Sequence, residues 1–83
     1  MKLIATAQTF SRDNEWVEYE IYRHGVRYRV VSQDCGLGGV DDEPTREWAT
    51  ATDVRHLLTM PDRDAGVVEF VDETECEKII EGC

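Results

Sequence analysis

The stretch from residue 15 to residue 32 constrains the fold most, because it reads as a β-hairpin. Apolar Val17, Tyr19 and Ile21 alternate with polar or charged neighbours, and the alternation resumes after Gly25. A period of two on both sides of a glycine-containing turn is typical of a half-buried antiparallel strand pair. The chain is therefore predicted to be built on an antiparallel sheet.

The loop of this hairpin sets which residues face each other. With His24 and Gly25 as a two-residue loop, Glu20 lies opposite Arg29. A three-residue loop with Gly25 in the left-handed conformation is the alternative, since glycine accepts a positive φ freely. The face expected to be buried holds Val17, Tyr19, Ile21, Val26, Tyr28 and Val30. On the other face we expect acidic residues to pair with basic ones, at about 0.2–1 kcal/mol per pair: Glu18, Glu20, Arg27 and Arg29.

The rest of the chain predicts strands and helices in alternation. Turn residues at 11–14 end a first strand over residues 2–10, and the glycine-rich residues 33–40 are expected to form a loop. The further expected elements are a short strand over 45–49, a helix from Thr50 to Met60 with a capping box at Thr50 and Asp53, a strand over 67–71, and a last helix capped by Asp72 with Glu75 three residues on.

Residues 44–60 also allow a second interpretation. A single helix can span them with Pro44 at its first position, where proline is well tolerated. Under either interpretation the fold class is α+β. A small antiparallel sheet, made of a three-stranded N-terminal meander plus one or two short strands, carries two helices packed on one face. With 83 residues, we expect a single domain over 1–83.

Acidic residues outnumber basic ones by 18 to 9, for a formal net charge of −9. Residues 34–47 hold five acidic and one basic residue, and residues 62–83 hold eight and two. Direct binding to nucleic acid or to an anionic membrane needs a basic surface, so we expect neither. The excess of acidic residues favours a protein partner with a basic surface, for instance one that normally holds nucleic acid.

Ten residues are candidates for contact with such a partner. Carboxylates can meet lysine and arginine clusters, and tryptophans beside charges are typical anchors of protein interfaces. For the tryptophans, completing the small core is the alternative. The predicted partner-binding residues are Asp41, Asp42, Glu43, Glu47, Trp48, Asp72, Glu73, Glu75, Glu77 and Trp16.

The sequence holds no pattern that points to catalysis, a cofactor or a metal. Three cysteines and two histidines lack the paired spacing of a zinc site, and no nucleophile motif is present. We therefore expect no enzyme activity, no cofactor and no metal. Cys35, Cys76 and Cys83 are expected to be free thiols in a reducing cytoplasm, although a bridge from Cys35 to either of the others stays open. No transmembrane or signal segment is expected.

The layout of the chain resembles small phage-encoded anti-CRISPR proteins. The resemblance rests on the opening MKLI strand, the hairpin IYRHGVRYRVV, a short strand, a Thr-capped helix and an acidic remainder. It covers residues 1–60 in layout, without a shared motif, so no residue roles are carried over from the family. It implies an inhibitor in the host cytoplasm that binds a Cas effector and blocks target DNA, with acidic charges mimicking nucleic acid. The alternative function is a small accessory or regulatory domain of a bacterial or phage assembly, homodimeric through an open sheet edge.

Overall fold

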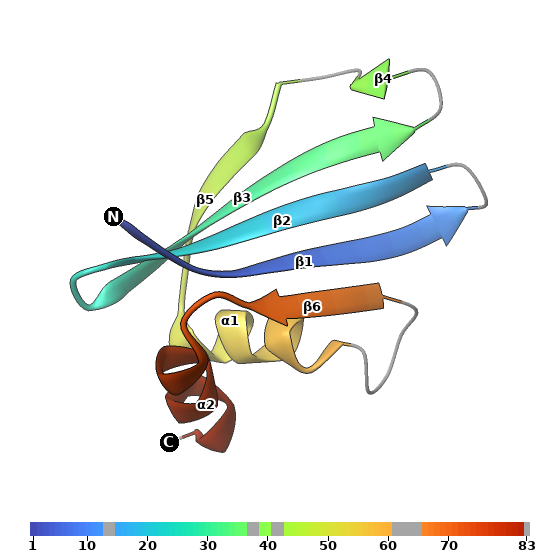
Figure 1. Cartoon of the computed structure of the whole chain (residues 1–83). Helices are drawn as coiled ribbons and strands as arrows, with labels where there is room; N and C mark the ends of the chain where they lie inside the picture. Colours follow the sequence, from blue (N-terminus) through green and yellow to red (C-terminus); the bar gives the residue numbers. More distant parts are fainter. Residues whose placement is uncertain (13–14, 37–38, 41–42, 61–65, 83) are drawn as a thin grey trace.

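The fold is described here from a computed structural model, for residues 1–12, 15–36, 39–40, 43–60 and 66–82. The sheet strands outnumber the helices, and the two helices come late in the chain (Figure 1). In chain order the elements are β1 (Lys2–Arg12), β2 (Glu15–His24), β3 (Arg27–Gly36), β4 (Gly39–Val40), β5 (Thr45–Ala49), α1 (Ala51–Leu58), β6 (Gly66–Phe70) and α2 (Glu73–Glu81).

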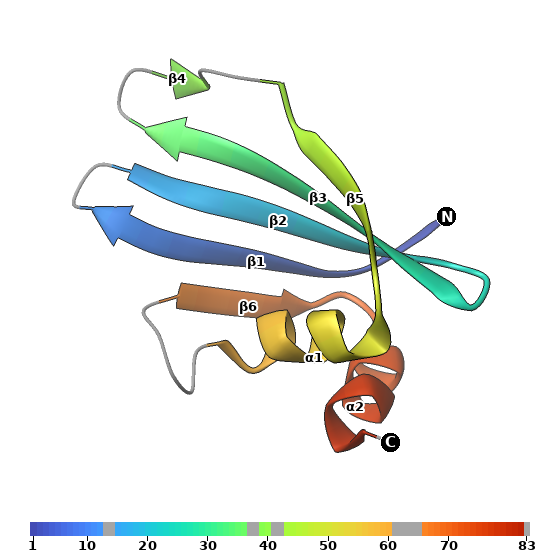
Figure 2. The ribbon, with the colours of Figure 1, turned by 180° about the vertical axis from the view of Figure 1, so that it is seen from behind.

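The strands form one sheet in the order β4-β3-β2-β1-β6, and β5 pairs with β3 along the edge that β4 also uses. Every strand pair is antiparallel. Both helices lie on the same side of the sheet and pack against each other, as the two opposite views show (Figures 1 and 2). The predicted α+β class, with two helices on one face of an antiparallel sheet, is confirmed.

The turn of the β2–β3 hairpin lies one residue later than predicted. It is formed by Gly25 and Val26, and Gly25 has a φ of +65°. Glycine with a positive φ at the first turn position is what a type II′ turn requires, whereas a His24–Gly25 loop of type I′ would force histidine to a positive φ. The predicted loop is therefore wrong. Val26, which we expected in the core, is 94% exposed at the tip.

The later turn also changes the charged pairs of the hairpin. Glu20 lies opposite Val31, and Arg29 lies opposite Tyr22. The predicted pairing of Glu20 with Arg29 is wrong, because moving the turn by one residue slides one strand past the other by two positions. The arginines of β3 consequently gather toward the turn, and the glutamates of β2 lie further along the strand.

Three consecutive apolar residues, Leu3, Ile4 and Ala5, interrupt the alternation of the first strand, and the structure shows why. The register of β1 against β2 shifts between Leu3 and Ala5, which marks a β-bulge or a similar irregularity. Such an irregularity lets two consecutive residues face the same side of the sheet. Ile4 and Ala5 are accordingly both fully buried.

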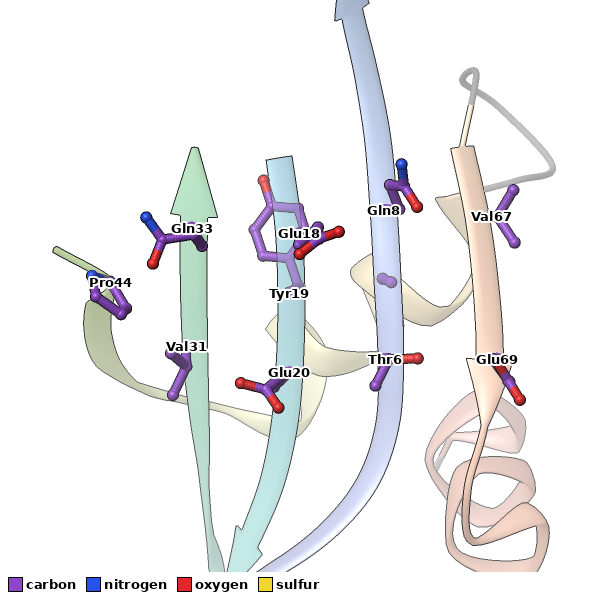
Figure 3. A pocket seen from close by; sticks show the side chains of 11 residues that line it. Thr6, Gln8, Glu18, Tyr19, Glu20, Val31, Gln33, Pro44, Val67 and Glu69 are labelled. Carbon is purple, nitrogen blue, oxygen red and sulfur yellow. The ribbon is translucent and has the colours of Figure 1, made fainter. Parts of the chain in front are cut away.

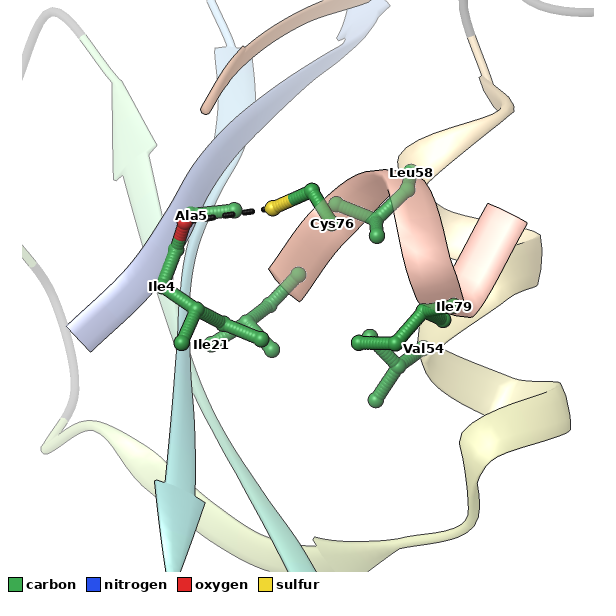
Figure 4. Packing of buried hydrophobic residues seen from close by; sticks show 7 residues of the cluster. All are labelled: Ile4, Ala5, Ile21, Val54, Leu58, Cys76 and Ile79. Carbon is green, nitrogen blue, oxygen red and sulfur yellow. Dashed lines mark hydrogen bonds between the residues drawn. The ribbon is translucent and has the colours of Figure 1, made fainter. Parts of the chain in front are cut away.

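The core lies between the sheet and the two helices (Figure 4). Ile4 and Ile21 project from the sheet, and Val54 of α1 and Cys76 of α2 meet them from the helical layer. The Cys76 thiol donates a hydrogen bond to the Ile4 carbonyl at 3.2 Å, which ties α2 to β1. The cluster of buried residues is Ile4, Ala5, Ile21, Val54, Leu58, Cys76 and Ile79.

A capping box separates β5 from α1. The Thr50 hydroxyl accepts a hydrogen bond from the Asp53 amide at 3.2 Å, and the Thr50 amide donates to the Asp53 carboxylate at 3.1 Å. These bonds satisfy amides that the first helical turn leaves without partners. Thr50 itself is extended, so the single helix over residues 44–60 is ruled out, and the strand over 45–49 is present as β5.

The predicted cap of α2 is confirmed, whereas the predicted loop over residues 33–40 is wrong. Asp72 begins α2 by accepting a hydrogen bond from the Glu75 amide at 3.1 Å, as expected, and Gly82 ends the helix at a φ of +79°. Residues 33–40 were expected to be a loop, yet β3 continues to Gly36 and Gly39 pairs back onto it. The prediction failed because a glycine-rich segment weakens a strand without preventing ladder hydrogen bonds. Of the expected turn at 11–14, residues 13–14 lie outside the described residues.

Candidate functional site

The ten predicted partner-binding residues do not form one surface. Asp41 and Asp42 lie outside the described residues, and Glu43 follows them as an exposed side chain. Glu47 is exposed on β5, where it pairs with a core-facing position of β3. The remaining residues divide between α2 and the face of the sheet that the helices leave open.

Two of the predicted acidic residues serve the fold itself. Asp72 caps α2 and forms an ion pair with Lys2, and Glu75 forms an ion pair with Arg23. The pKa of the Asp72 carboxyl is held below its usual value, mainly because Lys2 donates a hydrogen bond to it and to a smaller extent because the Glu75 amide does so too. Because their charges are compensated within the chain, Asp72 and Glu75 are poor candidates for partner contact.

Three glutamates of α2 are free of such structural duties, and we call them the acidic stripe: Glu73, Glu77 and Glu81. All three are exposed and recur every fourth residue. Four residues of α-helix rise about 6 Å, so the carboxylates follow one another along the same side of the helix. Glu73 and Glu77 were predicted. Glu81 was left out of the predicted set, although the spacing of four residues could have identified it.

Repulsion within the acidic stripe destabilises its helix, although Glu73 at the helix N-terminus and Lys78, three residues before Glu81, offset part of that cost. Like charges at this spacing destabilise a helix by about 0.2–0.5 kcal/mol per pair. Glu81 also ends the helix, where the partial negative charge of the carbonyl groups disfavours a carboxylate. A repulsive arrangement at an exposed helix is what a surface selected for binding can show.

The second candidate surface is the open face, which we define as the side of the sheet opposite the helices. Trp48 of β5 lies there at 49% exposure, opposite Arg29 of β3. The guanidinium carbon of Arg29 lies 4.8 Å from the centre of the Trp48 ring, and that of Arg27 lies 5.5 Å from it. The His24 ring is 5.7 Å away. Trp48 is thus surrounded by the side chains of Arg27, Arg29 and His24.

Trp16 lies further along the same face. It is half-buried, pairs with Cys35 across the β2–β3 ladder, and donates a hydrogen bond from its indole nitrogen to Glu18 at 3.2 Å. Neither tryptophan belongs to the buried cluster of the core. Trp16 and Trp48 are separated by the rows of side chains between them, so the structure does not bring them together.

A shallow hollow of about 500 Å³ lies on the open face (Figure 3). Figure 3 shows Glu18 and Glu20 on β2 and Glu69 on β6, with both helices behind the sheet. The other lining residues are Thr6, Ala7, Gln8, Tyr19, Val31, Gln33, Pro44 and Val67. The hollow presents carboxylates and amides, which suit hydrogen-bond donors and cations.

The cysteines are not arranged for chemistry within the described part of the chain. Cys35 and Cys76 are both free thiols, and Cys83 lies outside the described residues. Burial raises the pKa of the Cys76 thiol to about 11, with the nearby Asp72 and Glu75 charges adding to the effect. Thiols with a raised pKa are poor nucleophiles at neutral pH. Among the described residues, no group of three or more His, Cys, Asp or Glu side chains is placed to hold a metal ion.

Comparison with protein-family models, with curated proteins and with solved structures finds no match to this chain. Neither helix of the described chain has the length and apolar composition needed to cross a membrane. What the protein does must therefore be argued from its two candidate surfaces.

Proposed function

We propose that this chain is a non-catalytic inhibitor of the anti-CRISPR kind, which binds a Cas effector and blocks its target DNA. The observation that carries the proposal is the acidic stripe. Three exposed carboxylates follow one another at about 6 Å along one helix, where neighbouring carboxylates repel one another. The layout of strands and helices, which resembles that of small acidic anti-CRISPR proteins, supports the same conclusion.

The proposed mechanism is exclusion of DNA without turnover. A groove that holds DNA neutralises phosphates with lysine and arginine, and binding there releases counterions. The acidic stripe would occupy such a groove, and the rest of the domain would block the path of the duplex. The net charge of −9 would also steer the encounter, by about 10–10³-fold in association rate at low salt.

The second candidate function is an accessory interaction domain of a bacterial or phage assembly. It is favoured by the open face, which carries an exposed tryptophan and a hollow yet is not covered by any described element. A domain of this kind would bind its partner through the open face, and substitutions in the acidic stripe would leave that binding unchanged.

A matched pair of variants separates these functions. Labelled target DNA is titrated with purified Cas effector complexes of several CRISPR types, in the presence of the protein. The triple variant Glu73→Gln, Glu77→Gln, Glu81→Gln should inhibit at least about tenfold more weakly, which corresponds to about 1.4 kcal/mol. The control variant Glu18→Gln, Glu20→Gln, Glu69→Gln removes the same charge from the open face and should inhibit like the parent protein.

Each alternative result has a distinct meaning. Loss of inhibition in the control variant alone would move the inhibitory surface to the open face. No inhibition of any effector complex by the parent protein would overturn the proposed function.

A further inference from the structure

The open face is electrically neutral on a strongly acidic chain, and its charges are separated by sign. Among the residues that the structure describes, three arginines and three glutamates project from it. The arginines lie toward the hairpin turn and the β5 edge, and the glutamates line the hollow: Arg27, Arg29 and Arg46, against Glu18, Glu20 and Glu69. Within the described part of the chain, the excess negative charge therefore lies off this face.

The opposite charges of the open face do not neutralise one another within the chain. None of the three arginines forms an ion pair in the described part of the chain. Glu18 and Glu20 accept hydrogen bonds from the neutral Trp16 and Tyr22. Elsewhere this chain does pair its charges, as with Lys2 and Asp72. Charges held apart on one face are available to a surface with the reverse arrangement.

We propose that this reverse arrangement is a second copy of the same chain, docked open face to open face. We call the side chains that lie side by side across neighbouring strands a row, so that Arg29 shares a row with Tyr22, and Glu20 shares the next row with Val31. A two-fold axis that lies between these two rows and runs across the strands turns each strand of one copy antiparallel to its counterpart. The side-chain rows of β2 and β3 are about 6.7 Å apart, and the strands are about 4.8 Å apart. Arg29 then comes over the Glu20 row of the second copy, and Arg27 comes over its Glu18 row.

Each of these contacts occurs twice, as an isologous interface requires. The arginines of β3 face β3 of the second copy, so each reaches one strand sideways to the glutamates of β2. The hollow of about 500 Å³ around Glu18 and Glu20 leaves room for the two guanidinium groups. The same rotation places Arg46 over the exposed ring of Trp48, where a cation–π contact can form.

The size of the face predicts a weak dimer. Four strands and eight residues of length give a flat patch of about 19 by 26 Å, or about 500 Å² per copy. This lies at the low end for specific interfaces, which is the range of transient complexes. Repulsion between two copies of charge −9 acts over long distances and is screened beyond about 8 Å at physiological salt, whereas close pairs are screened less. We expect a dissociation constant of about 10–100 μM at that salt concentration.

Sedimentation velocity of the purified chain at concentrations from about 10 to 500 μM tests the proposal. The parent protein should dimerise, whereas Arg27→Glu, Arg29→Glu and Glu18→Arg, Glu20→Arg should each be at least about tenfold weaker, because each leaves five of the six charges of the face with the same sign. We call these two the single-sign variants. Mixing these two variants should restore the dimer, and so should combining all four substitutions in one chain. The control Glu73→Arg, Glu77→Arg makes the same net charge change as the second variant but lies on α2, and it should dimerise at least as well as the parent.

A parent protein that stays monomeric at about 500 μM would overturn the proposal. So would a dimer that survives the single-sign variants, since it must then use another surface such as a sheet edge. Loss of both single-sign dimers without recovery in the mixture would also contradict it. The proposal does not rest on the proposed function, because it needs no partner and uses a different surface, so either one can fail alone.

Discussion

Replacing Glu81 by lysine should stabilise this protein, although no buried contact changes. Glu81 is the last residue of α2, four residues after Glu77, and it is exposed. The substitution removes one like-charge pair and creates an attraction between Glu77 and the introduced lysine, with the glutamate first as the favourable order requires, each about 0.2–0.5 kcal/mol. It also replaces an unfavourable charge at the helix end by a favourable one, at about 0.3–1 kcal/mol for each charge.

Lys78, three residues before Glu81, attracts the glutamate and would repel the introduced lysine, which subtracts about 0.2–0.5 kcal/mol for each of these two changes. The sum is a stabilisation of about 1 kcal/mol, which raises Tm by about 4–8 °C in a domain of this size. Thermal unfolding followed by circular dichroism at low ionic strength measures it. The gain should shrink in about 1 M NaCl, where the screening length falls to about 3 Å.

Glu73→Lys is the matched control, because it makes the same change in net charge at the opposite end of the same helix. There the carboxylate is favoured by the helix N-terminus, so its loss offsets the gain from removing the Glu73–Glu77 repulsion. We expect no stabilisation, or a small destabilisation. Equal stabilisation by Glu73→Lys and Glu81→Lys would refute the reasoning, since relief of total charge would then explain both.

Three further predictions concern the fold. Ile21→Ala should lower the free energy of unfolding by about 2–5 kcal/mol, whereas Val26→Ala should change it by less than about 0.5 kcal/mol. Urea denaturation measures both, and comparable losses in the two variants would contradict the hairpin register. The Lys2 ammonium lowers the folded-state pKa of Asp72, so the stability gained from this carboxylate is present above its unfolded pKa and is lost as the pH falls through the lower, folded value. The stability difference between the parent and Asp72→Asn should therefore shrink on acidification, and a difference that grows would have the wrong sign. Cys76 should react with a thiol reagent at about pH 8 far more slowly in the folded chain than in urea, when followed in a variant that lacks the other two cysteines; equal rates would show that it is not buried.

The hairpin shows where sequence reasoning succeeds and where it stops. Alternation fixed which residues of β2 and β3 share a face, because side chains alternate strictly along a strand. It did not fix the turn. Moving the loop from His24–Gly25 to Gly25–Val26 slides the strands by two positions, and every side chain except those of the loop stays on its face. Both loops therefore fit the hydrophobic pattern, and the backbone preference of Gly25 decides between them.

The sequence shows that the protein is acidic, but it does not show which carboxylates form ion pairs within the fold and which do not. The cap at Asp72 could be predicted because it is local, four residues from start to end. The ion pairs of Lys2 with Asp72 and of Arg23 with Glu75 join residues 70 and 52 positions apart, and no sequence pattern marks them. These pairs are what remove Asp72 and Glu75 from the predicted site and leave Glu73 and Glu77.

Which residues lie next to one another on the open face can be known only from the strand order. Trp48 was predicted to be a contact residue because it follows an acidic run, but its neighbours come from β3, which pairs with β5. The sequence does not show that pairing. The arginines around Trp48 could therefore be found only from the structure.

We propose that this protein occupies the site where a Cas effector holds DNA. The most direct test is a titration of target DNA into the effector complex at several fixed concentrations of the protein. We predict that the apparent dissociation constant for DNA rises with the protein concentration, while saturating DNA restores full binding. A reduced plateau at an unchanged dissociation constant, or no effect on any effector complex, would contradict the account.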